Sequence, residues 1–146
     1  MAIYQGALIA NNTPPKTAVQ GLISKTASVV ITAALDVTGN IWQLMKISAG
    51  ATVLGVKVTA NEGLDSSTGA LISVGDSLST TPAASATKYI SSNATVGRAN
   101  FVGAVSTVIP NTYIIDDIII LTLTAQSTTH ALDATIYVTV EYTMDE

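Results

Sequence analysis

The sequence predicts an all-β chain, folded as an antiparallel β-sandwich with an N-terminal arm or extension. Glu occurs at only three positions and Arg at one, so strong helix formers are scarce. Val, Ile and Thr dominate instead, and their branched side chains favour pleated strands. Segments that alternate between apolar and polar residues are separated by turn-forming clusters of Gly, Asn, Ser and Pro. Short strands at such spacing are typical of a sandwich.

The first 27 residues differ from the rest because they show no sustained alternation. They contain the Pro14-Pro15 pair, which favours an extended backbone. We therefore expect an arm over residues 1–27 and one sandwich domain over residues 28–146. A strand and loop folded back on the same sandwich is the alternative.

Four later segments alternate with a period of two, and each is expected to bury one face. These faces are Val29, Ile31, Ala33 and Leu35; Leu54, Val56, Val58 and Ala60; Ile119, Leu121 and Leu123; and Ile136, Val138, Val140 and Tyr142. Residues 70–74 form a shorter strand candidate. Residues 96–109 stay open between strand and irregular structure, because Gly97 and Gly103 weaken a helix there.

Residues 41–47 are apolar in both phases of the alternation. Ile41, Met45 and Ile47 oppose Trp42 and Leu44. A strand of this kind is expected to be covered on both faces, with a neighbouring subunit as one possible cover.

The composition suits a chain that contacts other proteins. Its 146 residues are enough for one domain, and 48% are hydrophobic while only 11% are charged. About 25% charged is ordinary. Mean hydropathy is +0.47, yet no run reaches the roughly 18 apolar residues of a membrane-spanning helix. The 21 Thr and 13 Ser supply the polar faces of the strands, so the surface is expected to be polar but weakly charged.

Several function classes are disfavoured by the sequence. The net charge is −4 and the six basic residues are never adjacent, so neither nucleic acid nor membrane is an expected partner. The absence of cysteine excludes disulfides and thiol chemistry. The N-terminus lacks the pattern of a signal peptide, which favours production in a cytoplasm.

The sequence contains three candidate sites, and each has a structural interpretation that we favour. His130 lies near Thr128, Thr129 and Asp133, but sequence neighbours in one turn do not make a catalytic triad, so a solvated loop histidine is expected. No phosphate loop, metalloprotease motif or nucleophile elbow is present.

The other two candidates are carboxylate clusters. Glu62, Asp65 and Asp76 flank a loop whose spacing does not match a calcium loop, so turn capping is expected. Asp116 and Asp117 are adjacent in an extended segment and would point to opposite faces. They are expected to interrupt an aggregation-prone strand rather than to perform acid–base catalysis.

The central segment resembles a known group of proteins. The run from Ile47 to Val58 leads into the Leu64–Gly69 loop, then the strand Leu71–Asp76, and later Lys88-Tyr89-Ile90 and Thr95-Val96-Gly97. Over residues 44–100, this layout resembles small β-sandwich virion proteins of tailed bacteriophages, several of which are head decoration, or cement, proteins.

The resemblance implies a jelly-roll-like fold, trimers at capsid three-fold positions, no cofactor or metal, and binding to the major capsid protein. The protein is then expected on the capsid surface. A head-fibre, tail or receptor-binding component is the alternative, and an enzyme is a distant third. The candidate subunit or capsid contacts are Tyr4, Leu8, Ile9, Pro14, Pro15, Leu22, Ile23, Trp42 and Leu44.

Overall fold

The computed structural model describes residues 3–5, 21–61, 70–76, 85, 87–93, 104–105, 110–130 and 132–144. Within these ranges the regular structure is entirely β-strand, and no helix is long and apolar enough to cross a membrane. The strands are β1 (Ile3–Gln5), β2 (Ile23–Ile31), β3 (Ile41–Ile47), β4 (Ala51–Ala60), β5 (Leu71–Asp76), β6 (Ile90–Asn93), β7 (Ala104–Val105), β8 (Asn111–Thr112), β9 (Asp117–Ala125) and β10 (Ala134–Met144).

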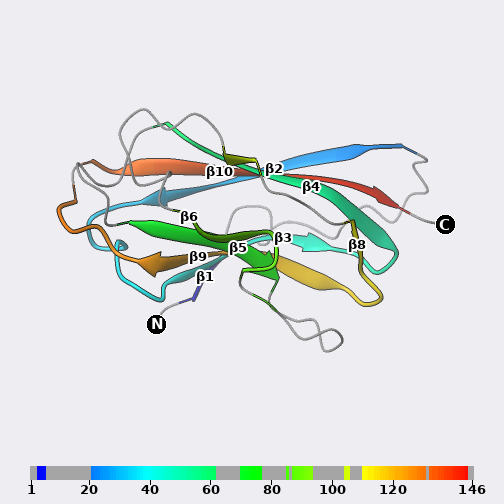
Figure 1. Ribbon diagram of the computed structural model, residues 1–146, viewed down its shortest axis with the longest axis horizontal. Helices are drawn as coiled ribbons and strands as arrows, with labels where there is room; N and C mark the ends of the chain where they lie inside the picture. The colour runs from blue at the N-terminus through cyan, green and yellow to red at the C-terminus, as the bar shows by residue number, and fades with distance from the viewer. Residues whose placement is uncertain are drawn as a thin grey trace.

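Two sheets are stacked face to face, as Figure 1 shows. The first sheet has the order β1-β3-β9-β5-β6, and the second has the order β2-β10-β4-β7, with β8 also pairing with β4. The pairs are nested along the chain: β2 pairs with β10, β3 with β9, β4 with β7 and β5 with β6, each antiparallel. A long hairpin rolled up in this way is a jelly roll. The predicted all-β sandwich is therefore confirmed.

The core lies between the inner faces of the two sheets. The predicted inward residues of β9 and β10 are all buried, from Ile119 to Leu123 and from Ile136 to Tyr142. Their alternating partners on β10, such as Tyr137 and Glu141, are exposed. Period-two patterning therefore decides which face of these strands meets the core.

A β-bulge explains why β3 is apolar in both phases. Gln43 pairs with Ile120 and Met45 with Ile119, so Leu44 is an extra residue between them. Such a bulge shifts the alternation by one residue. Trp42 and Leu44 before the shift and Met45 and Ile47 after it are all buried in the core. The chain's own core buries these residues, with no need of the neighbouring subunit that the pattern suggested.

A second bulge overturns the predicted face of β4. Glu141 pairs with Gly55 and Tyr142 with Val53, so Leu54 is left out of the ladder. Val53 is fully buried and Leu54 is 42% exposed, the reverse of the prediction for these two residues. Val56 and Val58 lie inward, as predicted.

The strand predicted over residues 29–35 ends early. Val29 and Ile31 are buried on β2, but the backbone N–H groups of Leu35 and Asp36 both donate to the carbonyl of Thr32, at 2.9 and 3.0 Å. Ala33 and Leu35 therefore lie in a turn and do not extend the strand.

The N-terminal segment is described at two places. β1 runs parallel to β3, with Tyr4 opposite Trp42, at the edge of the first sheet. β2 begins at Ile23, before the expected domain start at residue 28. Residues 6–20 lie outside the described residues, so an arm over that part stays a prediction.

Candidate functional site

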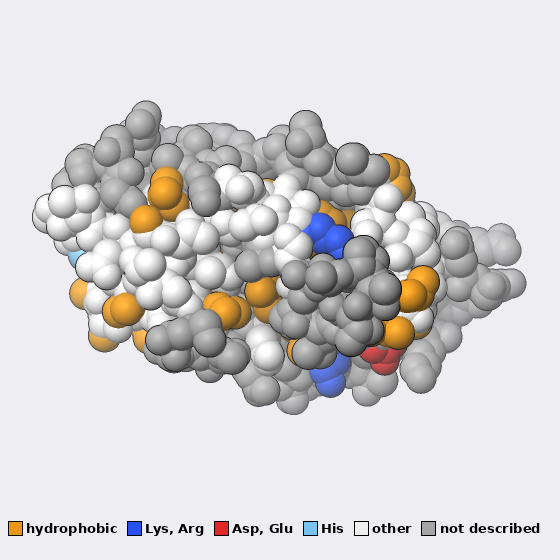
Figure 2. All heavy atoms as spheres, turned by 60° about the horizontal axis from the view of Figure 1, so that its bottom comes forward, with side chains coloured by type: hydrophobic (Ala, Val, Ile, Leu, Met, Phe, Trp, Pro, Cys, Tyr) orange, Lys and Arg blue, Asp and Glu red, His pale blue; other side chains and the backbone are white. Residues whose placement is uncertain are grey.

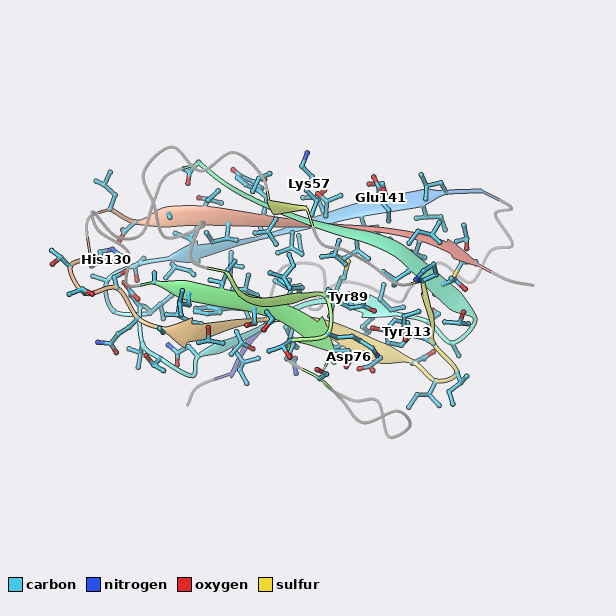
Figure 3. All side chains as sticks on the ribbon, viewed as in Figure 1. Lys57, Asp76, Tyr89, Tyr113, His130 and Glu141 are labelled. Carbon is cyan, nitrogen blue, oxygen red and sulfur yellow. The ribbon has the colours of Figure 1, made fainter. Side chains whose placement is uncertain are left out.

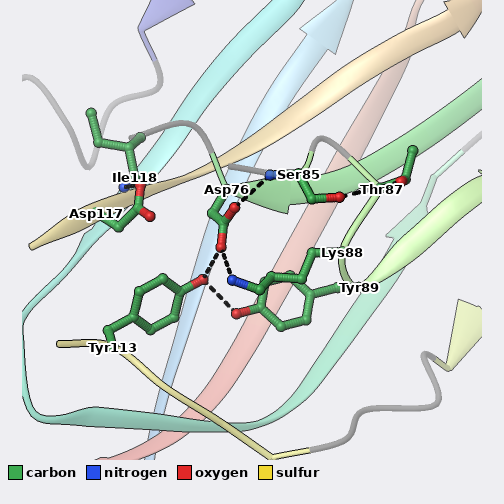
Figure 4. A network of polar contacts seen from close by, with 8 residues as sticks. All are labelled: Asp76, Ser85, Thr87, Lys88, Tyr89, Tyr113, Asp117 and Ile118. Carbon is green, nitrogen blue, oxygen red and sulfur yellow. Dashed lines mark hydrogen bonds and ion pairs between the residues drawn. The ribbon is translucent and has the colours of Figure 1, made fainter. Parts of the chain in front are cut away.

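A buried carboxylate organises one end of the sandwich. Asp76 is the last residue of β5, and its side chain is fully buried. Its Oδ2 forms an ion pair with the ammonium of Lys88 and accepts a hydrogen bond from the Tyr113 hydroxyl at 3.0 Å (Figure 4). Its Oδ1 accepts the backbone N–H of Ser85 at 2.9 Å. Both oxygens are thus satisfied, which a buried charge requires.

Two tyrosines extend this network. The hydroxyls of Tyr89 and Tyr113 are hydrogen-bonded to each other, and the Lys88 ammonium lies 5.1 Å from the centre of the Tyr113 ring. Burial raises the pKa of Tyr89 to about 12, and burial together with the neighbouring Tyr89 and Asp76 raises the pKa of Tyr113 as well. Both phenols therefore stay neutral near pH 7 and serve as hydrogen-bonding groups.

The Asp76 network connects three separate parts of the chain. Asp76 comes from the end of β5, Lys88 and Tyr89 from the segment before β6, and Tyr113 from the turn between β8 and β9. Its carboxylate is closed off from solvent and its hydrogen bonds are internal. We interpret it as a structural anchor rather than a site that meets a substrate.

A second polar cluster, the His130 clasp, lies toward the other end of the sandwich: His130 is at the left tip of Figure 3, whereas Asp76, Tyr89 and Tyr113 lie right of the centre. His130 Nδ1 is 2.8 Å from Asp36 Oδ2, and Nε2 is 3.2 Å from Asp133 Oδ1. Asp36 Oδ1 also accepts the backbone N–H of Ser127 at 3.0 Å. The clasp therefore connects the turn after β2 with the turn after β9.

The clasp favours the protonated imidazole. The hydrogen bond to Asp36 raises the pKa of His130, and the bond to Asp133 adds to the effect, although partial burial opposes it. Because both ring nitrogens contact carboxylates, neither is left to take a proton from a hydroxyl group. This arrangement does not support the nucleophilic chemistry of a triad.

The expectation of a solvated loop histidine is wrong. The His130 side chain is only 19% exposed and is paired on both sides. Asp36, its closer partner, lies 94 residues away in the sequence. The pairings of β2 with β10 and of β3 with β9 bring the two turns together, so no local pattern indicated this contact.

The other carboxylate candidates act as structural ligands where they are described. Asp116 is exposed and accepts the backbone N–H of Ala49 at 2.9 Å, whereas Asp117 is buried and accepts that of Ile118 at 2.7 Å. Asp76 pairs with Lys88, and the 62–69 loop lies outside the described residues. No group of three metal-ligating side chains is found in the part of the chain that is described.

The predicted contact residues fall into three groups. Trp42 and Leu44 are buried in the core, so they do not present a surface to a partner. Leu22 is 60% exposed, and Ile23 is half-buried against the core. The side chains of Tyr4, Leu8, Ile9, Pro14 and Pro15 lie outside those that are described.

Exposed apolar side chains are mostly scattered over the surface. Figure 2 shows them as separate spots on a face with few charged side chains. Ile114 is 69% exposed and its neighbour Ile115 is 37% exposed, next to the Asp76 network. Val37 and Leu132 flank the His130 clasp, with exposed fractions of 45% and 56%. Sequence reasoning did not single out these four as contacts, although isoleucines in a turn are an unusual choice.

The fold is similar to that of chains in solved structures of phage capsids. No protein-family profile and no curated protein matches the sequence. A chain in the capsid of Ralstonia phage GP4 is 16% identical, with a TM-score of 0.75 over 99% of both chains. A chain in the capsid asymmetric unit of cyanophage Pam1 is 22% identical, with a TM-score of 0.71 over 92% of this chain and 93% of that one.

A third similar chain comes from the acidic stable capsid of Helicobacter pylori bacteriophage KHP30. It is 16% identical, with a TM-score of 0.60 over 85% of this chain and 89% of that one. At these identities the likeness concerns the fold. This chain therefore shares its fold, over nearly its whole length, with chains found in three phage capsids.

Proposed function

We propose that this chain is a non-enzymatic structural protein of a bacteriophage virion, and specifically a head decoration protein. In this role it binds the outer surface of the major capsid lattice and stabilises it as a cement. It is made in the host cytoplasm and assembles as a homo-oligomer, with a trimer favoured.

The observation that carries the proposal is the end-to-end match with chains of capsids. The GP4 chain is covered over 99% of its length by 99% of this chain. The matched protein is therefore a small jelly roll of nearly the same size, rather than one domain of a larger shell protein. A small separate chain in a capsid structure fits an accessory role better than the role of the shell itself.

The physical character of the molecule suits this role. The Asp76 network and the His130 clasp each connect distant segments, so the sandwich is held firmly at both ends. The outer face of the second sheet carries few charged side chains. Its hydroxyl side chains include those of Thr26, Ser28 and Thr139. Weak charge limits repulsion when many copies crowd onto one shell, and symmetric repetition strengthens weak single contacts.

The test is binding to purified heads that lack this protein. The purified chain is mixed with expanded heads, and its occupancy is measured by co-sedimentation and by electron cryo-microscopy. We expect saturable density on the outer surface at symmetry-related positions. Decorated heads should also release their DNA at a higher temperature than bare ones. Heads that are already decorated are the matched control and should take up no further protein.

The outcomes separate the two candidate functions. A chain that fails to bind heads but labels tails, fibres or host cells would support the fibre, tail or receptor-binding alternative. A chain that binds heads without raising the temperature of DNA release would be a decoration protein without a cementing role. Sedimentation of the free protein would show the number of copies in the oligomer.

A further inference from the structure

One turn of the sandwich presents two adjacent isoleucines to solvent. Ile114 and Ile115 lie between β8 and β9, and we name this pair the isoleucine tip. Ile114 is the most exposed large apolar side chain among the described residues, at 69%. Turns are normally built from Gly, Asn, Asp, Ser or Pro, which satisfy the backbone at little cost. Two exposed β-branched residues are not needed to make this turn.

The backbone on both sides of the tip is fixed. The N–H of Tyr113 donates to the carbonyl of Ala51 at 2.8 Å, and the carbonyl of Tyr113 accepts the N–H of Gly50 at 2.7 Å. On the other side, the Asp116 carboxylate accepts the N–H of Ala49 at 2.9 Å. Gly50 has a φ of 85°, a left-handed conformation that favours glycine. The turn between β3 and β4 is therefore hydrogen-bonded to the turn between β8 and β9, which carries the isoleucine tip.

The Asp76 network fixes Tyr113, the residue that precedes the isoleucine tip. The Tyr113 side chain is buried, and its hydroxyl binds Asp76 and Tyr89. Ile114 thus follows directly on a residue that is anchored by its side chain and by both backbone groups. A rigid apolar projection loses little conformational entropy when it is buried against a partner.

The apolar residues at the opposite end are less suited to a dry contact. Leu132 lies in the sequence between His130 and Asp133, two residues of the clasp, and the Asp133 side chain is 60% exposed. Burying Leu132 would also take that carboxylate out of water, which costs free energy unless the partner compensates it. At the tip, the adjacent Asp116 is exposed as well, but its carboxylate is fixed by the backbone N–H of Ala49 at 2.9 Å, whereas Asp133 contacts the His130 ring at 3.2 Å.

The isoleucine tip is small, and its size limits the kind of interface that it can form. A stable two-body interface buries about 800 Å² on each partner, far more than two isoleucine side chains can offer. The tip is therefore too small to hold a pair of copies together alone. A small contact can suffice where one oligomer presents several copies of it to a repeating surface, because the linked contacts bind together.

We propose that the isoleucine tip is a contact by which this protein attaches to the capsid shell, inserting Ile114 and Ile115 into an apolar depression of the shell protein. This inference rests on the proposed decoration function. It assigns the contact to one end of the sandwich, next to the turn after β3.

The test compares two matched double variants in head binding. Ile114→Ser with Ile115→Ser removes the tip, and Val37→Ser with Leu132→Ser removes two exposed apolar residues at the other end. Each variant is titrated onto bare heads beside the wild type, and its apparent affinity is measured by co-sedimentation. We expect about tenfold or greater weakening for the tip variant and wild-type affinity for the control variant. Equal melting temperatures of the free proteins would show that both variants are folded.

The failures are distinguishable. If the wild type does not bind heads, the decoration function is overturned, and this inference with it. If the wild type binds and the tip variant binds equally well, only the isoleucine tip is excluded as a contact. If the tip variant instead separates into smaller oligomers during sedimentation, the tip joins copies of this chain and the inference is overturned.

Discussion

At each end of the sandwich a buried aspartate is paired with a basic side chain, a lysine at one end and a histidine at the other. At one end the fully buried side chain of Asp76 is paired with Lys88, and at the other the nearly buried side chain of Asp36 is paired with His130. In each case the carboxylate also accepts a backbone N–H: Asp76 that of Ser85, 9 residues away, and Asp36 that of Ser127, 91 residues away. A lysine ammonium keeps its charge throughout the neutral range, whereas an imidazole titrates there. The end that contains His130 is thus held more firmly in mild acid than in mild alkali.

Because of this difference, the end that contains the Asp76 network is better suited than the end with the His130 clasp to hold a surface in a fixed position. The Asp76 network supports the isoleucine tip and joins three segments of chain, with its charges shielded from solvent. The His130 clasp has one exposed carboxylate, Asp133, that is free to turn into water. Mutations should therefore be more damaging at the first end, and pH changes should act mainly on the second.

The largest effect is expected from Asp76→Ala. This change leaves the Lys88 ammonium and the Tyr113 hydroxyl without their common acceptor in a buried site. We expect a loss of about 3 kcal/mol in the free energy of unfolding, measured with urea at pH 7. Asp36→Ala, the equivalent change at the other end, should cost only about 1–2 kcal/mol, because His130 can lose its charge. Equal losses would contradict the proposed difference between the ends.

Tyr113→Phe should have the next largest effect. It removes the hydroxyl that donates to Asp76 and leaves the Tyr89 hydroxyl without that partner, while keeping the buried ring. We expect about 1–2 kcal/mol of destabilisation in the same urea experiment. Tyr137→Phe is the matched control, because Tyr137 is 39% exposed on β10 and should change stability by less than about 0.5 kcal/mol. An unchanged stability of Tyr113→Phe would show that Lys88 and the Ser85 N–H satisfy the Asp76 carboxylate without the phenol.

Much of the fold follows from alternation along the chain. The inward faces of β9 and β10 were predicted correctly because each strand keeps one phase over the predicted stretch. The prediction for β4 was wrong at Val53 and Leu54, because Leu54 is a bulge residue, and the bulge at Leu44 makes β3 apolar in both phases. An apolar run in both phases is consistent with a bulge or with a strand covered on both sides, and only the pairing partner distinguishes them.

The polar clusters were beyond the reach of sequence reasoning. His130 and Asp36 are 94 residues apart, and Asp76 and Tyr113 are 37 apart. A jelly roll pairs the first strand with the last, so its side-chain contacts are mostly between segments distant in sequence. Asp116 and Asp117 were predicted to point to opposite faces of an extended segment; Asp116 precedes β9 and is exposed, whereas Asp117 begins the strand and is buried, and each accepts a different backbone N–H.

Titration should separate the two ends by pH. The raised pKa of His130 means that its stabilising contribution is fully present below about pH 6.5 and is lost as the pH rises through the folded pKa. The wild type should exceed His130→Gln in stability by about 0.5–1 kcal/mol in mild acid, and the gap should close in mild alkali. Over the same range the cost of Tyr113→Phe should stay constant, because the raised pKa values of Tyr113 and Tyr89 keep both phenols neutral. A gap that widens with rising pH would contradict this sign.

The Tyr89 phenol in the Asp76 network should ionise only in strong alkali. Its pKa is raised to about 12, so the fold favours the neutral phenol and loses that contribution as the pH rises from about 10 to about 12. Tyrosinate absorbance should show Tyr89 and Tyr113 ionising above the ordinary tyrosine pKa of about 10. Early ionisation of all tyrosines in the folded protein would mean that the Asp76 network is open to solvent.

The smallest effect is expected from Asp133→Asn. Because the Asp133 side chain is 60% exposed, solvent screens its charge, and the change should cost less than about 0.5 kcal/mol. His130 is the only histidine, so its ring resonances in NMR report its protonation without ambiguity. Asp133→Asn should lower the pKa of His130 slightly, and Asp36→Asn should lower it more, because Asp36 is the closer and more buried partner. The reverse order would mean that the exposed carboxylate holds the imidazolium, and that the buried Asp36 serves mainly to accept the N–H of Ser127.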